Sequence, residues 1–124
     1  MARGTLIAES LRVGAALAGP PLTVSEVRRV DAELSAEQRA AGLAERWTLI
    51  AFEVADERAA ELADALAAVL DEPGWYADLH TDARSFVVFA GRVFAYDRGD
   101  AAGRAAAEAH GRARGVPEAQ LDWP

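Results

Sequence analysis

The 124-residue sequence predicts one α+β domain in which an antiparallel sheet carries two helices packed on one face. From residue 47 onward, segments with strand and helix patterns follow in the order strand, helix, three strands, helix. Within the three strands, one set of alternate side chains is entirely apolar, as expected for a sheet face that helices cover. Hydrophobic residues make up 52% of the chain, which is enough for a core without disulfides.

Residues 1–46 are an N-terminal segment whose structure the pattern leaves open, ahead of the 47–124 core. Apolar side chains in residues 6–17 fit helical and strand spacing equally well. The spacing of Thr23 and Glu26 matches a helix capping box, whereas the apolar alternation after two prolines favours a strand. We therefore expect a strand over residues 22–30.

Residues 31–46 are polar and rich in alanine, which is typical of a linker or of a short surface helix. Ser35 would cap that helix, with Gln38 at the capping-box position. The stretch LTVSEV at residues 22–27 resembles the opening of a DNA-binding helix-turn-helix. No second helix with exposed basic and amide side chains follows it, and the acidic chain is unsuited to DNA, so we reject this interpretation.

The apolar run WTLIAFEV at residues 47–54 predicts a central strand covered on both faces. Asp56 is a natural N-cap for the next helix, whose apolar side chains recur at helical spacing up to residue 70. Asp-Glu-Pro-Gly at 71–74 ends that helix.

Three strands are then expected at about residues 75–80, 85–90 and 92–97. Asp100 would cap a last helix that ends near Gly115. This order is close to the ferredoxin-like sandwich, although the three-strand meander departs from it. The N-terminal segment would add one or two strands.

The turns between these strands also predict how they pair. A two-residue turn at Ala90-Gly91 would set Ser85 opposite Tyr96, and the turn before it would set His80 opposite Ser85. One face of the meander is then apolar and faces the helices. It comprises Trp75, Ala77, Leu79, Phe86, Val88, Val93 and Ala95.

The other face of the meander mixes aromatic, aliphatic and ionisable side chains, which is unusual for either a solvated face or a core. It comprises Tyr76, Asp78, His80, Ser85, Val87, Phe89, Arg92, Phe94 and Tyr96. Aromatic side chains with a few convergent polar groups are typical of a small-molecule pocket and also of a protein interface. Interface, ligand pocket and catalytic site therefore all remain open for this face.

If the face is catalytic, His80 is the expected acid–base group, because its charge changes near neutral pH. Asp78 lies on the same face about 7 Å along the strand, and Tyr96 and Arg92 could bind an anion or polarise a carbonyl group. As ligand-binding residues we expect Tyr76, Ser85, Phe89, Arg92 and Phe94. We expect no metal site, because one His and one Asp fall short of the usual three or four ligands.

Composition excludes several classes of function. The net charge is −7 and lysine is absent, so no basic cluster is available to bind nucleic acid. The apolar run from Leu6 to Leu17 contains Glu9 and Arg12, so we expect neither a signal peptide nor a membrane span. The absence of cysteine favours the cytoplasm. No motif indicates a cofactor.

The stretches PGWYADLHTD, FVVFAGRVFAYDRGD and GVPEAQLDW together resemble a group of small bacterial proteins of unknown function. The resemblance covers about residues 47–123 and implies no activity and no site residue. In the last stretch, Leu121 and Trp123 predict a tail that packs back on the domain or on a partner.

From these observations we expect a homodimeric binding or accessory protein that uses the mixed face of its sheet. Its partner would be another protein or a small organic ligand. The alternative is a small acid–base enzyme, such as a lyase, isomerase or cyclase, with His80 as the base.

Overall fold

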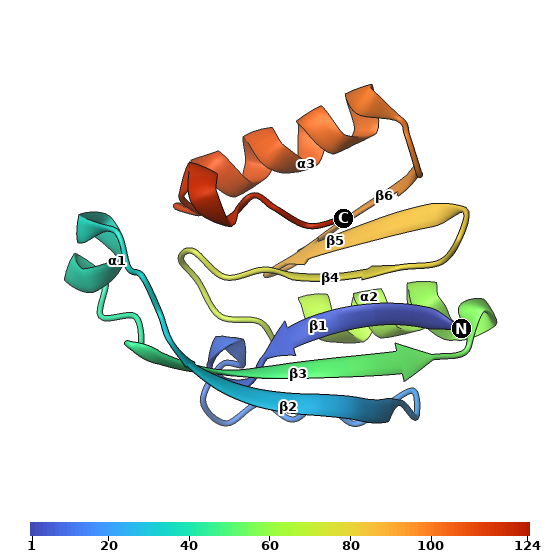
Figure 1. Ribbon diagram of the computed structural model, residues 1–124, viewed down its shortest axis with the longest axis horizontal. Coiled ribbons are helices and arrows are strands. Elements are labelled where there is room, and N and C mark those ends of the chain that lie inside the picture. The colour runs from blue at the N-terminus through green and yellow to red at the C-terminus, as the bar shows by residue number, and fades with distance from the viewer.

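The computed structural model describes residues 1–124 and contains one six-stranded antiparallel sheet with the strand order β2-β3-β1-β4-β5-β6 (Figure 1). The α+β class is confirmed, whereas the ferredoxin-like arrangement is not shown. The strands are β1 (Ala2–Ile7), β2 (Thr23–Asp31), β3 (Arg46–Val54), β4 (Ala77–His80), β5 (Arg84–Phe89) and β6 (Arg92–Asp97).

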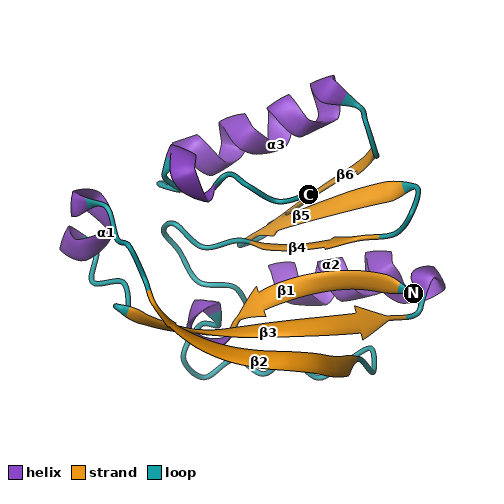
Figure 2. Ribbon diagram, viewed as in Figure 1, coloured by secondary structure: helices purple, strands orange, loops and turns teal.

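The N-terminal segment supplies two of these strands. β1 lies in the middle of the sheet, between β3 and β4, and β2 forms one edge (Figure 2). Gly4 makes the central position of β1 feasible, because a Cβ there would collide with the backbone oxygen of Asp78 and the ring of Phe52. The predicted strand over residues 22–30 is confirmed as β2.

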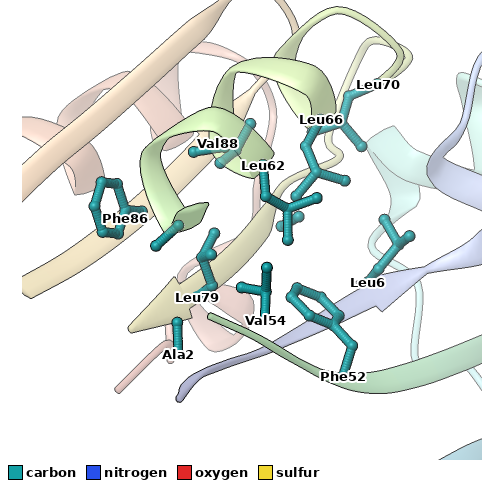
Figure 3. Packing of buried hydrophobic residues seen from close by; sticks show 13 residues of the cluster. Ala2, Leu6, Phe52, Val54, Leu62, Leu66, Leu70, Leu79, Phe86 and Val88 are labelled. Atoms are coloured by element: carbon teal, nitrogen blue, oxygen red, sulfur yellow. The ribbon is translucent and has the colours of Figure 1, made fainter. Parts of the chain in front are cut away.

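The main core lies between one face of the sheet and α2 (Ala59–Ala67). Leu62 and Leu66 of this helix are fully buried against strand residues, among them Phe52, Leu79 and Val88 (Figure 3). Asp56 does not cap α2. It begins a 3₁₀ turn ahead of the helix, and its carboxylate lies 3.3 Å from the N-terminal amine.

A second helix, α3 (Ala101–Ala113), packs on the opposite face of the sheet. The expectation that both helices share one face is therefore wrong. Phe86 and Val88 of β5 belong to the α2 core, whereas Val87 and Phe89 lie under α3, and successive side chains of a strand point to opposite faces. The aromatic character of the second face is the physical reason, since exposing it to water would be costly.

Small residues on α3 let it approach the sheet closely. A Cβ at Gly103 would lie 2.5 Å from the Cβ of Tyr96, and one at Gly111 would lie 2.9 Å from a methyl carbon of Leu121. Asp100 caps the helix as expected, because its carboxylate accepts a hydrogen bond from the Gly103 amide at 3.1 Å.

The predicted strand pairing is confirmed for all three strands of the meander. Ser85 lies opposite both His80 and Tyr96, and Asp78 lies opposite Val87. The side chains of Asp78 and His80 therefore point away from α2.

The short helix α1 (Ala36–Ala40) begins with the predicted capping box. The Ser35 hydroxyl accepts a hydrogen bond from the Gln38 amide, and the Gln38 side chain accepts one from the Ser35 amide, both at 3.1 Å. None of the helices has the length and hydrophobicity that a membrane span requires.

Candidate functional site

The second face of the sheet divides into a half that the chain itself covers and a half that stays open. β4, β5 and β6 lie under α3 and the C-terminal tail, residues 117–124, which runs between α3 and the sheet (Figure 1). No helix covers β1, β3 and β2 on this face. The prediction that β3 is covered on both faces is wrong, since most of its residues are only half-buried.

A cleft of about 1010 Å³ occupies the open half and ends against the tail. Its floor is formed by β1 and β3 through side chains such as Thr5, Ile7, Leu49 and Ala51. The tail forms one wall, and residues 30–35 form another. The mixed face of the meander contributes Tyr76, Asp78 and His80 to the lining. The cleft is therefore assembled from five separate parts of the chain.

β1 sets the neighbours of the two ionisable side chains on β4. Arg3 lies opposite His80 and Thr5 lies opposite Asp78 in the antiparallel pairing. On its other side Arg3 faces Glu53 of β3, and the two side chains form an ion pair at 3.3 Å. Because Glu53 compensates the charge of Arg3, the guanidinium group adds little net positive charge to the cleft.

The C-terminal tail is fixed by a buried tryptophan. Trp123 donates a hydrogen bond from its indole nitrogen to the Tyr96 hydroxyl at 2.9 Å and is 3% exposed. Arg104 of α3 donates to the Trp123 carbonyl oxygen at 2.7 Å and lies over the indole ring, 5.3 Å from its centroid. The expectation that Trp123 packs back on the domain is confirmed.

Tyr76 joins the tail to the sheet beside the cleft. Its hydroxyl lies 2.6 Å from the Gln120 carbonyl oxygen and 3.0 Å from Oδ1 of Asp122, and either oxygen can accept its hydrogen bond. Burial and the charges of Asp122 and Asp78 raise the pKa of Tyr76. The phenol therefore stays a hydrogen-bond donor, which holds Asp122 at the rim of the cleft.

A pair of glutamines closes one end of the same wall. The side-chain amides of Gln38 in α1 and Gln120 in the tail donate to each other at 3.0 and 3.2 Å. Gln38 is buried and also forms the capping box, so the position of α1 and the position of the tail are coupled.

Asp78 is the carboxyl group of the cleft whose pKa is most perturbed. Its carboxylate makes no hydrogen bond and no ion pair with the protein, and the residue is only half-buried where it lines the cleft. Burial, together with the charge of Asp122, raises the pKa of Asp78 to about 7. At neutral pH this side chain can therefore either donate or accept a proton.

His80 also lines the cleft, although its Nδ1 atom is buried and has no hydrogen-bond partner. Burial and the nearby charges of Arg98 and Arg3 lower the pKa of His80, while Asp82 opposes them. The imidazole is therefore mostly neutral at pH 7. No hydrogen bond joins His80 to Asp78.

The remaining predicted site residues lie away from the cleft, under α3 or at the far edge of the sheet. Ser85, Phe89 and Tyr96 are buried, and Tyr96 is occupied by its hydrogen bond from Trp123. Phe94 is half-buried and stacks near Phe89, with ring centroids 5.9 Å apart. Arg92 is exposed and lies over the Phe94 ring, 4.6 Å from its centroid. The predicted face is thus split between a core and a cleft.

Several cleft residues were not predicted. Trp75 does not join the α2 core as expected, but packs on Trp47 with ring centroids 5.2 Å apart, and both rings line the cleft. Asp122 and Gln120 come from the tail, where only the apolar residues suggested packing. No short motif links residues so far apart, so no local signal could have assembled them.

The structure contains no group of three or more His, Cys, Asp or Glu side chains arranged to hold a metal ion. Comparison with family models identifies no matching family, and neither curated proteins nor solved structures give a match.

Proposed function

We propose that the protein binds a small organic molecule in the cleft on the open half of its sheet. The cleft itself is the single observation that carries this proposal. Its volume of about 1010 Å³ lies at the upper end of the range of ligand pockets, roughly 300–1,000 Å³. Its lining combines apolar side chains with a few convergent polar groups, as such pockets do.

The fold supports a ligand cleft over a protein interface on this face. The aromatic anchors that favoured an interface, Phe89 and Tyr96, are buried under α3 and the tail of the same chain. What stays open holds the cleft, and a concave surface suits a small ligand.

Filling the cleft tests this function. Ala51 lies on the cleft floor and is half-buried, so Ala51→Phe places a ring in the cleft without entering the α2 core. Ala105→Phe on the exposed side of α3 is the matched control. We expect small molecules that bind the wild type, detected by amide chemical-shift changes, to lose at least tenfold in affinity for A51F and none for A105F. Equal binding to both variants would contradict the proposal.

Acid–base catalysis in the same cleft is the second candidate, and the pKa of about 7 for Asp78 favours it, since a general base works best near the ambient pH. Asp78 rather than His80 would then be the proton carrier. Turnover of a captured ligand, followed by NMR, should be abolished in D78N and retained in H80Q. Turnover that is lost in H80Q and retained in D78N would identify His80 as the proton carrier.

A further inference from the structure

The charges that line the cleft are unbalanced. Five carboxylates line it, whereas Arg3 is its only arginine. Arg3 is paired with Glu53 at 3.3 Å, and Asp31 is paired with Arg46 at 3.3 Å. The carboxylates without a cationic partner in the structure are Glu33, Asp78 and Asp122.

The apolar part of the lining is unusually aromatic. All three tryptophans of the chain, Trp47, Trp75 and Trp123, line the cleft together with Tyr76. Tyr76 packs on Trp123 with ring centroids 5.2 Å apart. The faces of aromatic rings carry negative electrostatic potential and attract cations. The lining therefore provides two kinds of group that favour positive charge.

Asp78 is the half-buried carboxylate of the cleft that the protein leaves without a hydrogen-bond or ion-pair partner. Its neighbours across the sheet are Thr5 on β1 and Val87 on β5, and neither brings a positive charge. The charge that acts on it is that of Asp122, which repels it. A bound cation would offset both the desolvation of the Asp78 carboxylate and its repulsion by Asp122, whereas a neutral or anionic ligand would not.

On the basis of the proposed ligand cleft, we infer that its ligand is an organic cation, either a protonated amine or a quaternary ammonium compound with an apolar body. The charge would lie against Asp78 and Asp122, and the body against the half-buried rings of Trp47 and Tyr76. Arg104 already uses one face of Trp123 in this way from the α3 side. Aromatic rings combined with carboxylates are a common means of binding ammonium groups.

Three probes of similar size, one positively charged, one neutral and one negatively charged, test this inference. They are 2-phenylethylamine, 2-phenylethanol and phenylacetate, titrated at pH 7.5 by calorimetry and by amide chemical shifts. We expect the amine to bind at least tenfold more tightly than the alcohol, and phenylacetate to bind more weakly still.

Equal or tighter binding of the alcohol or of phenylacetate would overturn the inference, while the ligand cleft would stand provided that A51F removes that binding. If none of the three probes binds the wild type, the result counts against both proposals.

Neutral variants separate charge from shape. D78N and D122N should each reduce the affinity for the amine at least tenfold and leave the affinity for the alcohol unchanged. Glu57→Gln, which removes an exposed carboxylate outside the cleft, is the matched control and should change neither. An amine affinity unaffected by both cleft variants would overturn the inference.

The pH dependence adds an independent readout. Asp78 is next to Asp122 of the tail and opposite Thr5 of β1. The other charged or titratable groups near it on the sheet are Tyr76, His80 and the ion pair of Arg3 with Glu53. Amine affinity should rise about tenfold from pH 6 to pH 8 as Asp78 ionises, and D78N should remove this rise. An unchanged pH profile in D78N would show that Asp78 is not the cation's partner.

Discussion

The face of the sheet that points away from α2 has two halves, and one is covered by the chain while the other is open. The closed half, on β5 and β6, presents Val87, Phe89 and Tyr96, which α3 and the tail bury. The open half, on β1 and β3, presents side chains such as Thr5 and Ala51 and stays uncovered as the cleft floor.

The comparison shows how one sheet serves two purposes. Large apolar side chains in the closed half bury enough area to hold a helix of small residues. In the open half, Thr5 and Ala51 lie beside Ile7 and Leu49, and this mixed surface has no helix above it. Tyr76 and Asp78 lie at the boundary between the two halves. There the C-terminal tail forms both the end of the core under α3 and one wall of the cleft.

The largest expected effect comes from truncating one large side chain in each half. Phe89→Ala should cost about 3 to 5 kcal/mol of unfolding free energy, because it leaves a cavity under α3. Leu49→Ala on the half-buried cleft floor should cost about 1 kcal/mol. Urea unfolding of both variants measures the two costs. Similar costs would show that the two halves do not differ as described.

Asp78, at the boundary between the two halves, makes the free energy of unfolding depend on pH. Its pKa rises from 3.8 to about 7 on folding, so the folded state favours the protonated form. The resulting stability is fully present below pH 3.8 and is lost as the pH rises through 7. Allowing for the part of the carboxyl that water reaches, D78N should exceed the wild type by about 2 kcal/mol at pH 8.

That advantage of D78N should disappear near pH 4, where both side chains are neutral. Thermal unfolding of the two proteins between pH 4 and 8 measures the difference, and other carboxylates cancel in it. A constant difference across this range would contradict the raised pKa.

The close contact of α3 with the sheet can be tested at Gly103. Alanine normally favours a helix by about 1 kcal/mol over glycine, but at this position the added methyl group meets Tyr96. We expect Gly103→Ala to cost about 1 to 2 kcal/mol net and to disturb the tail contacts. Ala105→Ser on the exposed side is the control. A stabilised G103A protein would mean that α3 is held less tightly than the geometry indicates.

The smallest expected effect concerns the amide pair that joins α1 to the tail. Gln38→Ala and Gln120→Ala should show a coupling of about 1 kcal/mol in a double-mutant cycle, since each removes both hydrogen bonds. Because Gln38 also caps α1, its single variant should cost more than that of Gln120. Zero coupling energy would show that α1 and the tail are not linked energetically through this amide pair.

Much of the local structure followed from patterns of a few residues. The capping box at Ser35, the Asp100 cap and the pairing of Ser85 with His80 and Tyr96 were all predicted and are all confirmed. The site was predicted less well. Three of the predicted residues, Tyr76, Asp78 and His80, line the cleft, but the other residues of that face do not.

By itself the sequence determined the α+β class, the strand pairing of the meander and the helix caps at Ser35 and Asp100, because turns, caps and side-chain alternation act over a few residues. Only the tertiary structure decided that α3 crosses to the face opposite α2, and that Thr5, Asp78 and Asp122 line one cleft. Both depend on which large surfaces must be buried together. Which surfaces are buried together depends on residues far apart along the chain, so a pattern of a few residues cannot predict it.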